Sequence, residues 1–281
     1  MPLPAAFDLD DFVRRVLAED LGSGGDVTSA ATIDADARFT AEMNCRQSVV
    51  VVGLDIAAAF FRALDPQVRF EQLAGDGDAV AAGAVLMRLE GSARALLAAE
   101  RSALNTLQHL SGIATLTRRY AEAIAGTGAT LLDTRKTVPG LRVLEKYAAR
   151  MGGAENHRMR LDDGVLIKDN HVAVCGGVVE AVRRAREANT GLPVQVEVDR
   201  IEQIEAALAA GADRLLLDNM PPPLLREAVE LVRGRVPLEA SGGVTLETIR
   251  AIAETGVDYI SVGRITQSAP AVDIGLDYAL S

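Results

Sequence analysis

The runs Pro193-Val-Gln-Val-Glu197 and Arg214-Leu-Leu-Leu-Asp218 decide the fold of this chain. Each is a short apolar segment that ends in a carboxylate. Glu239 and then Ser261 continue the series at nearly the same spacing. The stretches between these positions have helical periodicity. This regular alternation predicts parallel strands that are joined by crossover helices.

Six apolar runs of this kind occur in the second part of the chain. They cover residues 129–132, 165–167, 193–196, 214–217, 236–238 and 259–262. Parallel strands with right-handed crossovers place all their carboxyl ends on one side, so the polar residues that follow them should converge on a single mouth. Six strands are fewer than the eight of an ordinary barrel, which predicts a reduced α/β barrel.

The first part of the chain mixes helix and strand without a regular repeat. We expect helices over 8–21, 55–64 and 92–125, with a break near Ser111-Gly112 in the last, and strands within 39–53, 68–73 and 84–90. The fold class is therefore α/β, with a mixed α+β N-terminal domain over 1–108 packed on a reduced, fewer than eight-stranded α/β barrel over 109–281. The C-terminal tail of the second domain can return to the first.

The composition is that of an acidic globular chain of 281 residues. It holds 29 basic and 39 acidic residues, a formal net charge of −10, and 49% hydrophobic residues. These proportions exclude a collagen, a disulfide scaffold and a disordered chain. With a pI near 4.9 the chain lacks the basic surface that general nucleic-acid binding needs. We therefore expect small-molecule substrates and no nucleic acid.

The sequence also predicts a cytoplasmic location. The first residues lack the cationic and apolar regions of a secretion signal. The longest apolar stretches, such as residues 49–54, are far shorter than the roughly 20 residues of a membrane span, so we expect no membrane. Cys45 and Cys175 are distant in the sequence and belong to no metal-binding motif, which predicts free thiols in a reducing compartment.

Lysine is rare in this chain. Of the 29 basic residues 26 are Arg, and the three lysines, Lys136, Lys146 and Lys168, all fall in one short stretch of the sequence. A compact ammonium and a planar guanidinium are not equivalent in a tight anion site. The cluster therefore predicts an anion site in which Lys could not be exchanged, although chance is an alternative.

The expected mouth gathers cations, carboxylates and glycines. Arg135, Lys136, His157, Arg158 and Lys168 follow strands or connect them, and such a cluster favours a polyanionic ligand. The segments Ser241-Gly-Gly243 and Ser261-Val-Gly263 follow the last two strands, where barrels often bind a phosphate. Glu197 and Asp218 suit sugar hydroxyls or a divalent ion, or else they pair with the neighbouring cations. The residues alone thus predict an enzyme for a phosphorylated, multiply anionic substrate.

Several motifs make the chain similar to a known family. They are Leu132-Asp-Thr-Arg-Lys-Thr-Val-Pro-Gly-Leu-Arg142, Asn156-His-Arg158, Leu166-Ile-Lys-Asp-Asn-His171, Glu239-Ala-Ser-Gly-Gly243 and, upstream, Ala99-Glu-Arg-Ser-Ala-Leu-Asn105. They resemble quinolinate phosphoribosyltransferases, the carboxylating nicotinate-nucleotide pyrophosphorylases of NAD biosynthesis, over nearly the whole chain. The resemblance implies a homodimer that transfers phosphoribose from phosphoribosyl pyrophosphate to quinolinate, with loss of carbon dioxide and pyrophosphate.

The resemblance also implies the roles of individual residues. Quinolinate would contact Arg135, His157, Arg158 and Lys168, together with Arg101 from the other subunit. Thr134 would join the substrate site. Lys136 and Lys168 would face phosphate oxygens, Glu197 and Asp218 the ribose hydroxyls, and Ser241, Gly242, Gly243, Val262, Gly263 and Arg264 the 5′-phosphate. The residues implied as catalytic are Lys136, Lys168, Glu197 and Asp218. His171 is expected behind the site, and His109 is expected to pack or face solvent.

The implied cofactor is Mg²⁺, bound mainly through phosphoribosyl pyrophosphate and near Glu197 and Asp218. No organic cofactor is expected, because the glycosylated, positive ring nitrogen itself stabilises the carbanion that decarboxylation leaves. The chain departs from the family at Gln267, where the family usually has His, and at Arg264, where a small residue is common. We therefore expect a weakened or rearranged phosphate contact, with Arg264 compensating.

Two other functions are compatible with parts of the pattern. A barrel aldolase could use Lys168 as a Schiff-base nucleophile. A pyrophosphorylase-related paralogue, of the kind associated with molybdate transport, could have a binding or accessory role. Such paralogues lack the Ile-Lys-Asp-Asn-His segment that this chain retains at 167–171, so the transferase is the preferred interpretation.

Overall fold

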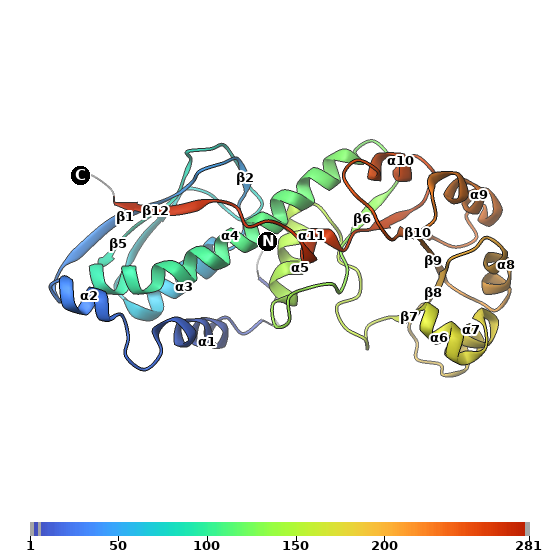
Figure 1. The fold of residues 1–281 in the computed structure, drawn as a ribbon, viewed down its shortest axis with the longest axis horizontal. Helices are drawn as coiled ribbons and strands as arrows, with labels where there is room; N and C mark the ends of the chain where they lie inside the picture. Colours follow the sequence, from blue (N-terminus) through green and yellow to red (C-terminus); the bar gives the residue numbers. More distant parts are fainter. Residues whose placement is uncertain (1–2, 5–6, 279–281) are drawn as a thin grey trace. The chain divides into compact units, whose positions relative to one another are not determined.

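The computed structural model of the chain describes residues 3–4 and 7–278 (Figure 1). These residues form two compact units. The first unit comprises residues within 1–116, together with 143–152 and the segment from 269 onward, and the second comprises 117–142 and 153–268. The expected boundary stood between 108 and 109. The chain instead passes from one unit to the other inside a long helix, and two later segments of the expected second domain belong to the first unit.

The first unit contains a four-stranded antiparallel sheet. Its strand order is β12 (Ile274–Tyr278), β1 (Arg38–Cys45), β5 (Val85–Ser92) and β3 (Arg69–Gln72). Along β1 the residues Ala41, Met43 and Cys45 are buried, as the two-residue side-chain period of a strand requires. A separate pair joins β2 (Val49–Val50) and β4 (Ala79–Val80). The sequence did not predict the strand β12 itself, but it did predict that the C-terminal tail returns to the first domain, and β12 makes this return by pairing with β1.

Helices accompany this sheet in the first unit. They are α1 (Leu9–Leu21), α2 (Val27–Thr32), α3 (Leu54–Leu64), the first part of α4 (Ala93–Ala123) and, except for its first residue, α5 (Arg142–Gly152). The side chain of Asp8 accepts a hydrogen bond from the Asp11 amide and caps α1, as the Asp-rich start predicts. The side chain of Asp26 caps α2 in the same way, but this short helix was not predicted.

Gly112 does not break α4, contrary to the expectation from the sequence. The helix is continuous from Ala93 to Ala123. A Cβ at Gly112 would lie 2.2 Å from the carbonyl oxygen of Pro270, so the glycine permits the C-terminal segment to pack against the helix. The Gln108 side chain then donates to the carbonyl oxygen of Ile274 at 2.7 Å. The glycine therefore serves a close backbone approach rather than a helix end.

The second unit contains a parallel sheet of six strands. Their order is β6 (Thr130–Leu132), β11 (Tyr259–Ser261), β10 (Leu238–Ser241), β9 (Arg214–Asp218), β8 (Val194–Val198) and β7 (Val165–Ile167). The connecting helices are α6 (Asp169–Cys175), α7 (Val178–Glu187), α8 (Glu202–Ala209), α9 (Pro222–Val232), α10 (Ile249–Ala253) and α11 (Arg264–Gln267). The expected α/β architecture with fewer than eight strands is confirmed.

One strand begins later than its apolar run. The sequence placed it at 236–238, whereas β10 covers Leu238–Ser241. Pro237 is exposed and has no N–H to donate to a ladder, while Leu238, Glu239 and Ala240 are buried. The strand therefore uses a buried Glu that the apolar pattern could not include.

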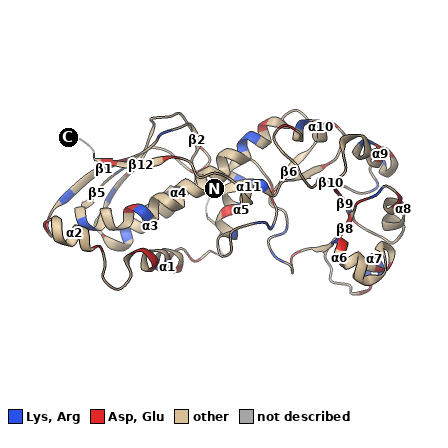
Figure 2. Cartoon of the chain, viewed as in Figure 1, with Lys and Arg blue, Asp and Glu red and all other residues tan. Residues whose placement is uncertain are grey.

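Charged side chains of both signs are interspersed over both units (Figure 2). The net charge of −10 is therefore not concentrated in one element. Among the described residues, no helix is long and apolar enough to span a membrane. Cys45 and Cys175 are both free thiols, as predicted.

Candidate active site

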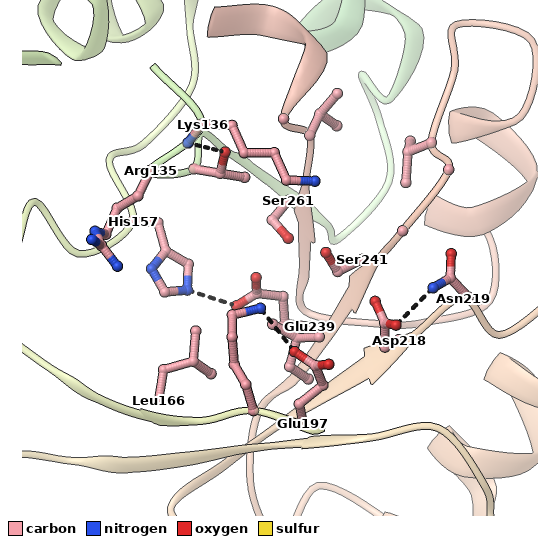
Figure 3. Close-up of a pocket in the computed structure, with 18 of the residues that line it drawn as sticks. Arg135, Lys136, His157, Leu166, Glu197, Asp218, Asn219, Glu239, Ser241 and Ser261 are labelled. Atoms are coloured by element: carbon pink, nitrogen blue, oxygen red, sulfur yellow. Dashed lines mark hydrogen bonds and ion pairs between the residues drawn. The ribbon is translucent and has the colours of Figure 1, made fainter. Parts of the chain in front are cut away.

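A cavity of about 650 Å³ opens at the carboxyl ends of the parallel strands in the second unit (Figure 3). It is lined by Thr134, Arg135, Lys136, His157, Arg158, Leu166, Lys168, Asp169, Glu197, Leu216, Asp218, Asn219, Glu239, Ser241, Gly242, Gly243, Val244, Ser261, Val262, Gly263, Arg264 and Gln267. Every residue that the resemblance assigned to the substrate lies here, except Arg101. The parallel sheet brings them together, because all its strands end on this side.

Arg101 lies elsewhere. It is an exposed residue of α4 in the first unit, and it is not among the residues that line the cavity. Lys146 is also in the first unit, on α5, and it is fully buried. Of the three lysines from which the sequence predicted an anion site, Lys136 and Lys168 line the cavity and Lys146 does not. His109 contacts the buried Glu145 at 2.8 Å, within the first unit.

Lys168 is held from two sides. Its Nζ donates to Oε2 of Glu197 at 2.9 Å, and the Glu197 side chain is nearly buried while that of Lys168 is half-exposed. The backbone amide of Lys168 donates to Nδ1 of His171 at 2.9 Å. His171 therefore lies behind the site and fixes the backbone of Lys168. The sequence left open whether Glu197 pairs with a neighbouring cation, and the structure shows that it pairs with Lys168.

Asp218 and the glycine loop after β10 are joined by Asn219, which the sequence analysis did not single out. The Asn219 side chain donates to Oδ2 of Asp218 at 2.6 Å, and its backbone amide donates to the carbonyl oxygen of Ser241 at 2.8 Å. Asn219 has a positive φ of 54°, which Asn adopts more readily than most residues. A Cβ at Gly242 would lie 2.2 Å from Oδ1 of Asn219, so this position requires glycine.

Lys136 lies across the segment that follows β11. A Cβ at Gly263 would come within 2.7 Å of Cδ of Lys136. The hydroxyl of Thr266 donates to the backbone carbonyl of Lys136 at 2.7 Å, and the Lys136 amide donates to the Thr134 hydroxyl at 3.1 Å. These contacts place the ammonium beside the Val262–Arg264 backbone, which is where the sequence predicts a phosphate.

Two guanidinium groups, those of Arg135 and Arg158, come close together at the cavity. Burial, and secondly the charge of Arg135, lower the pKa of Arg158 below its ordinary value. Nη1 of Arg158 donates to the carbonyl oxygen of Gly164 at 2.8 Å. Nε of Arg135 is buried and has no hydrogen-bond partner among the described residues. Two close cations of this kind are stabilised by an anion that accepts hydrogen bonds from them.

The Asn156–Arg158 segment is anchored by a buried carboxylate. Asp133 is fully buried directly after β6. Its Oδ1 accepts from the His157 amide at 2.8 Å, and its Oδ2 accepts from the Asn156 side chain at 2.6 Å. The motif around residues 156–158 therefore has a structural reason for its Asn, and the backbone of His157 is fixed at the cavity.

Glu239 is a fully buried carboxylate at the base of the cavity. It accepts from the Gln195 side chain at 2.8 Å, and it lies 2.9 Å from Nη2 of Arg214 and 3.3 Å from Nε2 of His157. Burial raises its pKa, but the contact with His157, the charge of Arg214 and the hydrogen bond from Gln195 lower it more, so the pKa lies below the ordinary value. The group therefore remains a carboxylate.

Metal ligands are sparse in this site. Among the residues that the structure describes, no cluster of three or more His, Cys, Asp or Glu side chains could hold a metal ion. Glu197 and Asp218 are two carboxylates that face the same cavity. This donor set fits a hard cation such as Mg²⁺ only when a ligand supplies further oxygens, as a pyrophosphate can.

Family models match almost the whole chain. The model for the N-terminal domain of quinolinate phosphoribosyl transferase matches residues 26–111, and the model for its C-terminal domain matches residues 113–277. The chain belongs to this family. The nicotinate-nucleotide pyrophosphorylase (carboxylating) of Mycobacterium leprae is 45% identical, over 95% of this chain and 96% of the relative. The protein named as probably the same enzyme in Bacillus subtilis is 42% identical, over 97% and 94%.

Solved structures of quinolinate phosphoribosyltransferases have the same fold. The nicotinate-nucleotide pyrophosphorylase of Ehrlichia chaffeensis superposes with a TM-score of 0.94 at 40% identity, over 98% of this chain and all of that chain. The enzyme of Francisella tularensis gives a TM-score of 0.92 at 40% identity, over 96% of each chain. As a member of this family, the chain is a decarboxylating pentosyltransferase of NAD biosynthesis, which joins quinolinate and phosphoribosyl pyrophosphate to give nicotinate mononucleotide.

Proposed function

We propose that the cavity holds quinolinate at its cation-rich side. The observation that carries this assignment is the pair Arg135 and Arg158, two partly buried guanidinium groups, one of them with a buried Nε that lacks a partner among the described residues. A planar guanidinium matches a carboxylate in a two-point contact, and each charge-assisted bond contributes about 1.5 to 3 kcal/mol. Lys168 lines the same cavity. A pyridine ring with two carboxylates can pair with all three of these cations.

Phosphoribosyl pyrophosphate occupies the remainder of the cavity in this proposal. Its 5′-phosphate contacts the backbone of Ser241, Gly242 and Gly243 and of Val262, Gly263 and Arg264, which follow two adjacent strands. Glu197 and Asp218 accept hydrogen bonds from the ribose hydroxyls. Lys136 and Lys168 face the phosphate oxygens. Gln267 also lines the cavity, and it donates a neutral hydrogen bond where the family usually has His, with Arg264 supplying the charge.

The reaction needs little covalent participation by the protein. Pyrophosphate leaves C1 of the ribose, and the quinolinate ring nitrogen forms the new bond at that carbon. The cations stabilise negative charge on the leaving group in a preorganised way, without rearrangement during the step. The carboxylate next to the glycosylated nitrogen then leaves as carbon dioxide, because the positive nitrogen stabilises the electron pair that remains. That carbon takes up one proton. The guanidinium groups hold the other carboxylate throughout.

Mg²⁺ is the proposed inorganic cofactor. Glu197 and Asp218 would help to hold it beside the pyrophosphate, and the ion would supply positive charge for the leaving group. No organic cofactor is part of the proposal.

We also propose a cytoplasmic homodimer in which Arg101 of one subunit completes the quinolinate site of the other. The free thiols of Cys45 and Cys175 support a reducing compartment, and the exposure of Arg101 outside its own cavity supports a role toward a partner.

One assay tests the proposed function. Purified chain, quinolinate, phosphoribosyl pyrophosphate and Mg²⁺ should yield nicotinate mononucleotide, carbon dioxide and pyrophosphate in equal amounts. Nicotinate should be a poor substrate, because the loss of one carboxylate leaves a buried cation unpaired. Equal turnover of nicotinate, or no product from quinolinate, would contradict the proposal. A Schiff-base aldolase is disfavoured because Nζ of Lys168 is paired with Glu197 at 2.9 Å, whereas Schiff-base formation needs a free amine.

A further inference from the structure

Both ring nitrogens of His157 are already bound by the protein. Nδ1 accepts a hydrogen bond from the backbone amide of Arg158 at 2.7 Å. Nε2 lies 3.3 Å from Oε2 of Glu239, the contact that Figure 3 marks with a dashed line. A backbone amide can only donate, so Nδ1 must be without a proton. A carboxylate can only accept, so Nε2 must carry one. These two partners together specify one of the two neutral forms of the imidazole ring.

Glu239 has two further partners besides His157. The guanidinium of Arg214 lies 2.9 Å from Oε2 of Glu239, and its Cζ lies 3.8 Å from the centre of the Tyr259 ring. The Gln195 side chain donates to the same oxygen at 2.8 Å. Glu239 is therefore a fixed carboxylate with one cation and one neutral donor, to which Nε2–H of His157 adds a third contact.

A second proton on the His157 ring is incompatible with the hydrogen bond that Nδ1 accepts. It would place an N–H at Nδ1 directly against the N–H of Arg158, across a distance of 2.7 Å. Among charged groups, Glu239 contacts the ring at Nε2, Asp133 accepts from the His157 backbone amide, and Arg214 contacts Glu239. The other charged residues that line the two cavities shared with His157 are Arg135, Lys136, Glu155, Arg158, Asp163, Lys168, Asp169, Glu197, Asp218 and Arg264.

We propose that Glu239 and the Arg158 amide hold His157 as the neutral imidazole protonated at Nε2. His157 and Glu239 are then positioning residues that fix the backbone and direction of Arg158, and the positive charge for the dicarboxylate comes from Arg135, Arg158 and Lys168. This proposal rests on the proposed function for the identity of the anion, but not for the state of the ring. It differs from the sequence expectation, in which His157 belonged to the cation set.

Nitrogen NMR of the full-length chain tests the state of the ring directly. The chain has three histidines, so ¹⁵N-labelled histidine gives three pairs of ring signals, and His109→Gln and His171→Gln variants assign two of them. At pH 7 we expect His157 to show a bare Nδ1 and a protonated Nε2, before and after quinolinate is added. Two protonated nitrogens at pH 7, or a proton on Nδ1 alone, would overturn the proposal.

Three variants test the positioning role by kinetics. The Oδ1 atom in His157→Asn replaces the Nδ1 acceptor, and the amide nitrogen in His157→Gln replaces the Nε2 donor. We expect each to raise the KM for quinolinate by less than about tenfold, the size of one neutral hydrogen bond. In Glu239→Gln a neutral acceptor remains for Nε2–H, so we expect a similarly small rise in KM and an unchanged pattern of His157 nitrogen signals.

The comparison variant is Arg135→Gln, which removes a charged contact and should raise the KM by about 10- to 150-fold. If His157→Asn and His157→Gln both raise the KM as much as Arg135→Gln does, His157 acts as a cation and the proposal is wrong. The NMR measurement needs no turnover. Failure of the proposed function, with no product from quinolinate, is therefore separate from failure of the ring assignment.

Discussion

At the scale of single residues, the site is built by contacts that hold the functional side chains in place before any ligand arrives. Glu197 holds Nζ of Lys168, and His171 holds its backbone amide. Asn219 holds Asp218 and approaches the glycine loop after β10. Preorganised groups need no rearrangement during the reaction, and this is how electrostatic catalysis gains its effect. The holding residues should therefore matter nearly as much as those that touch substrate.

Gly242→Ala tests this at the phosphate loop. Its Cβ would overlap Oδ1 of Asn219 at 2.2 Å, and φ at this position is +95°, which L-residues rarely adopt. We expect Asn219 to move away from Asp218 and the KM for phosphoribosyl pyrophosphate to rise at least tenfold, with a smaller change for quinolinate. Gly243→Ala is the matched control: φ is also positive there, at +61°, but its Cβ meets nothing closer than 4.0 Å, so this variant has the backbone strain without the overlap. Equal kinetic effects of the two changes would refute the role of the Asn219 contact.

At the scale of elements, the sequence predicted what depends on local pattern. The repeated apolar runs and their polar ends predicted five of the six parallel strands close to their observed positions, because buried parallel strands have a continuous apolar signature. The fifth run, at 236–238, was displaced by a buried Glu that hydropathy does not anticipate. The return of the C-terminal tail to the first domain was predicted, but its pairing as β12 with β1 was not, because this pairing joins segments that are very distant in the sequence.

The site residues likewise fall into those that the sequence predicted and those that it did not. Residues in the motifs were predicted because they are charged residues that follow strands. Asn219 was missed because its role comes from its positive φ and from its contact with a loop one strand away. Glu239 was noticed only as a strand end, although its partners Gln195 and Arg214 come from two other strands. Contacts across strands depend on register, which the sequence pattern alone did not define.

Asp65 gives a prediction about how elements are joined in the first unit. It ends α3, and its side chain accepts from the amides of Ser92, at the end of β5, and of Gln67. The hydrogen bond from Ser92 is the main cause that lowers the pKa of Asp65, and it outweighs burial. A lowered pKa in the folded state adds stability at neutral pH, and this stability is lost as the pH falls through the folded value, below about 4.

We therefore expect Asp65→Asn to lower the free energy of unfolding by about 1 to 3 kcal/mol at pH 7, because an amide nitrogen then faces one of the two backbone donors. The difference from the parent chain should shrink at pH 3.5, where the parent begins to lose the same interaction. Urea denaturation at both pH values measures it. Asp36→Asn, at an exposed turn residue, is the control and should change stability by no more than about 0.5 kcal/mol. A difference that stays constant with pH would show that the charge of Asp65 is not involved.

At the scale of the whole molecule, Arg101 and the cavity belong to different units of the chain. Arg101 belongs to the first unit, whereas all the residues that line the cavity belong to the second. In a twofold dimer, each subunit can contribute residues to the site of its partner, and the symmetry repeats this contribution in the second site. Under the proposed homodimer, a subunit that lacks Arg101 damages only its partner's site. A subunit that lacks Lys168 damages only its own.

Mixed dimers of these two variants should therefore recover activity. Arg101→Ala and Lys168→Ala dimers should each be nearly inactive, but one mixed dimer has one site with both lesions and one site with neither. Co-refolding equal amounts makes about half of the dimers mixed, so roughly a quarter of all sites should be intact. The matched control mixes Lys136→Ala with Lys168→Ala. Both lesions then lie in the cavity of their own subunit, every site keeps one lesion, and no activity should return. If native mass spectrometry detects mixed dimers of the first pair and the mixture stays as inactive as this control, Arg101 does not act across the dimer.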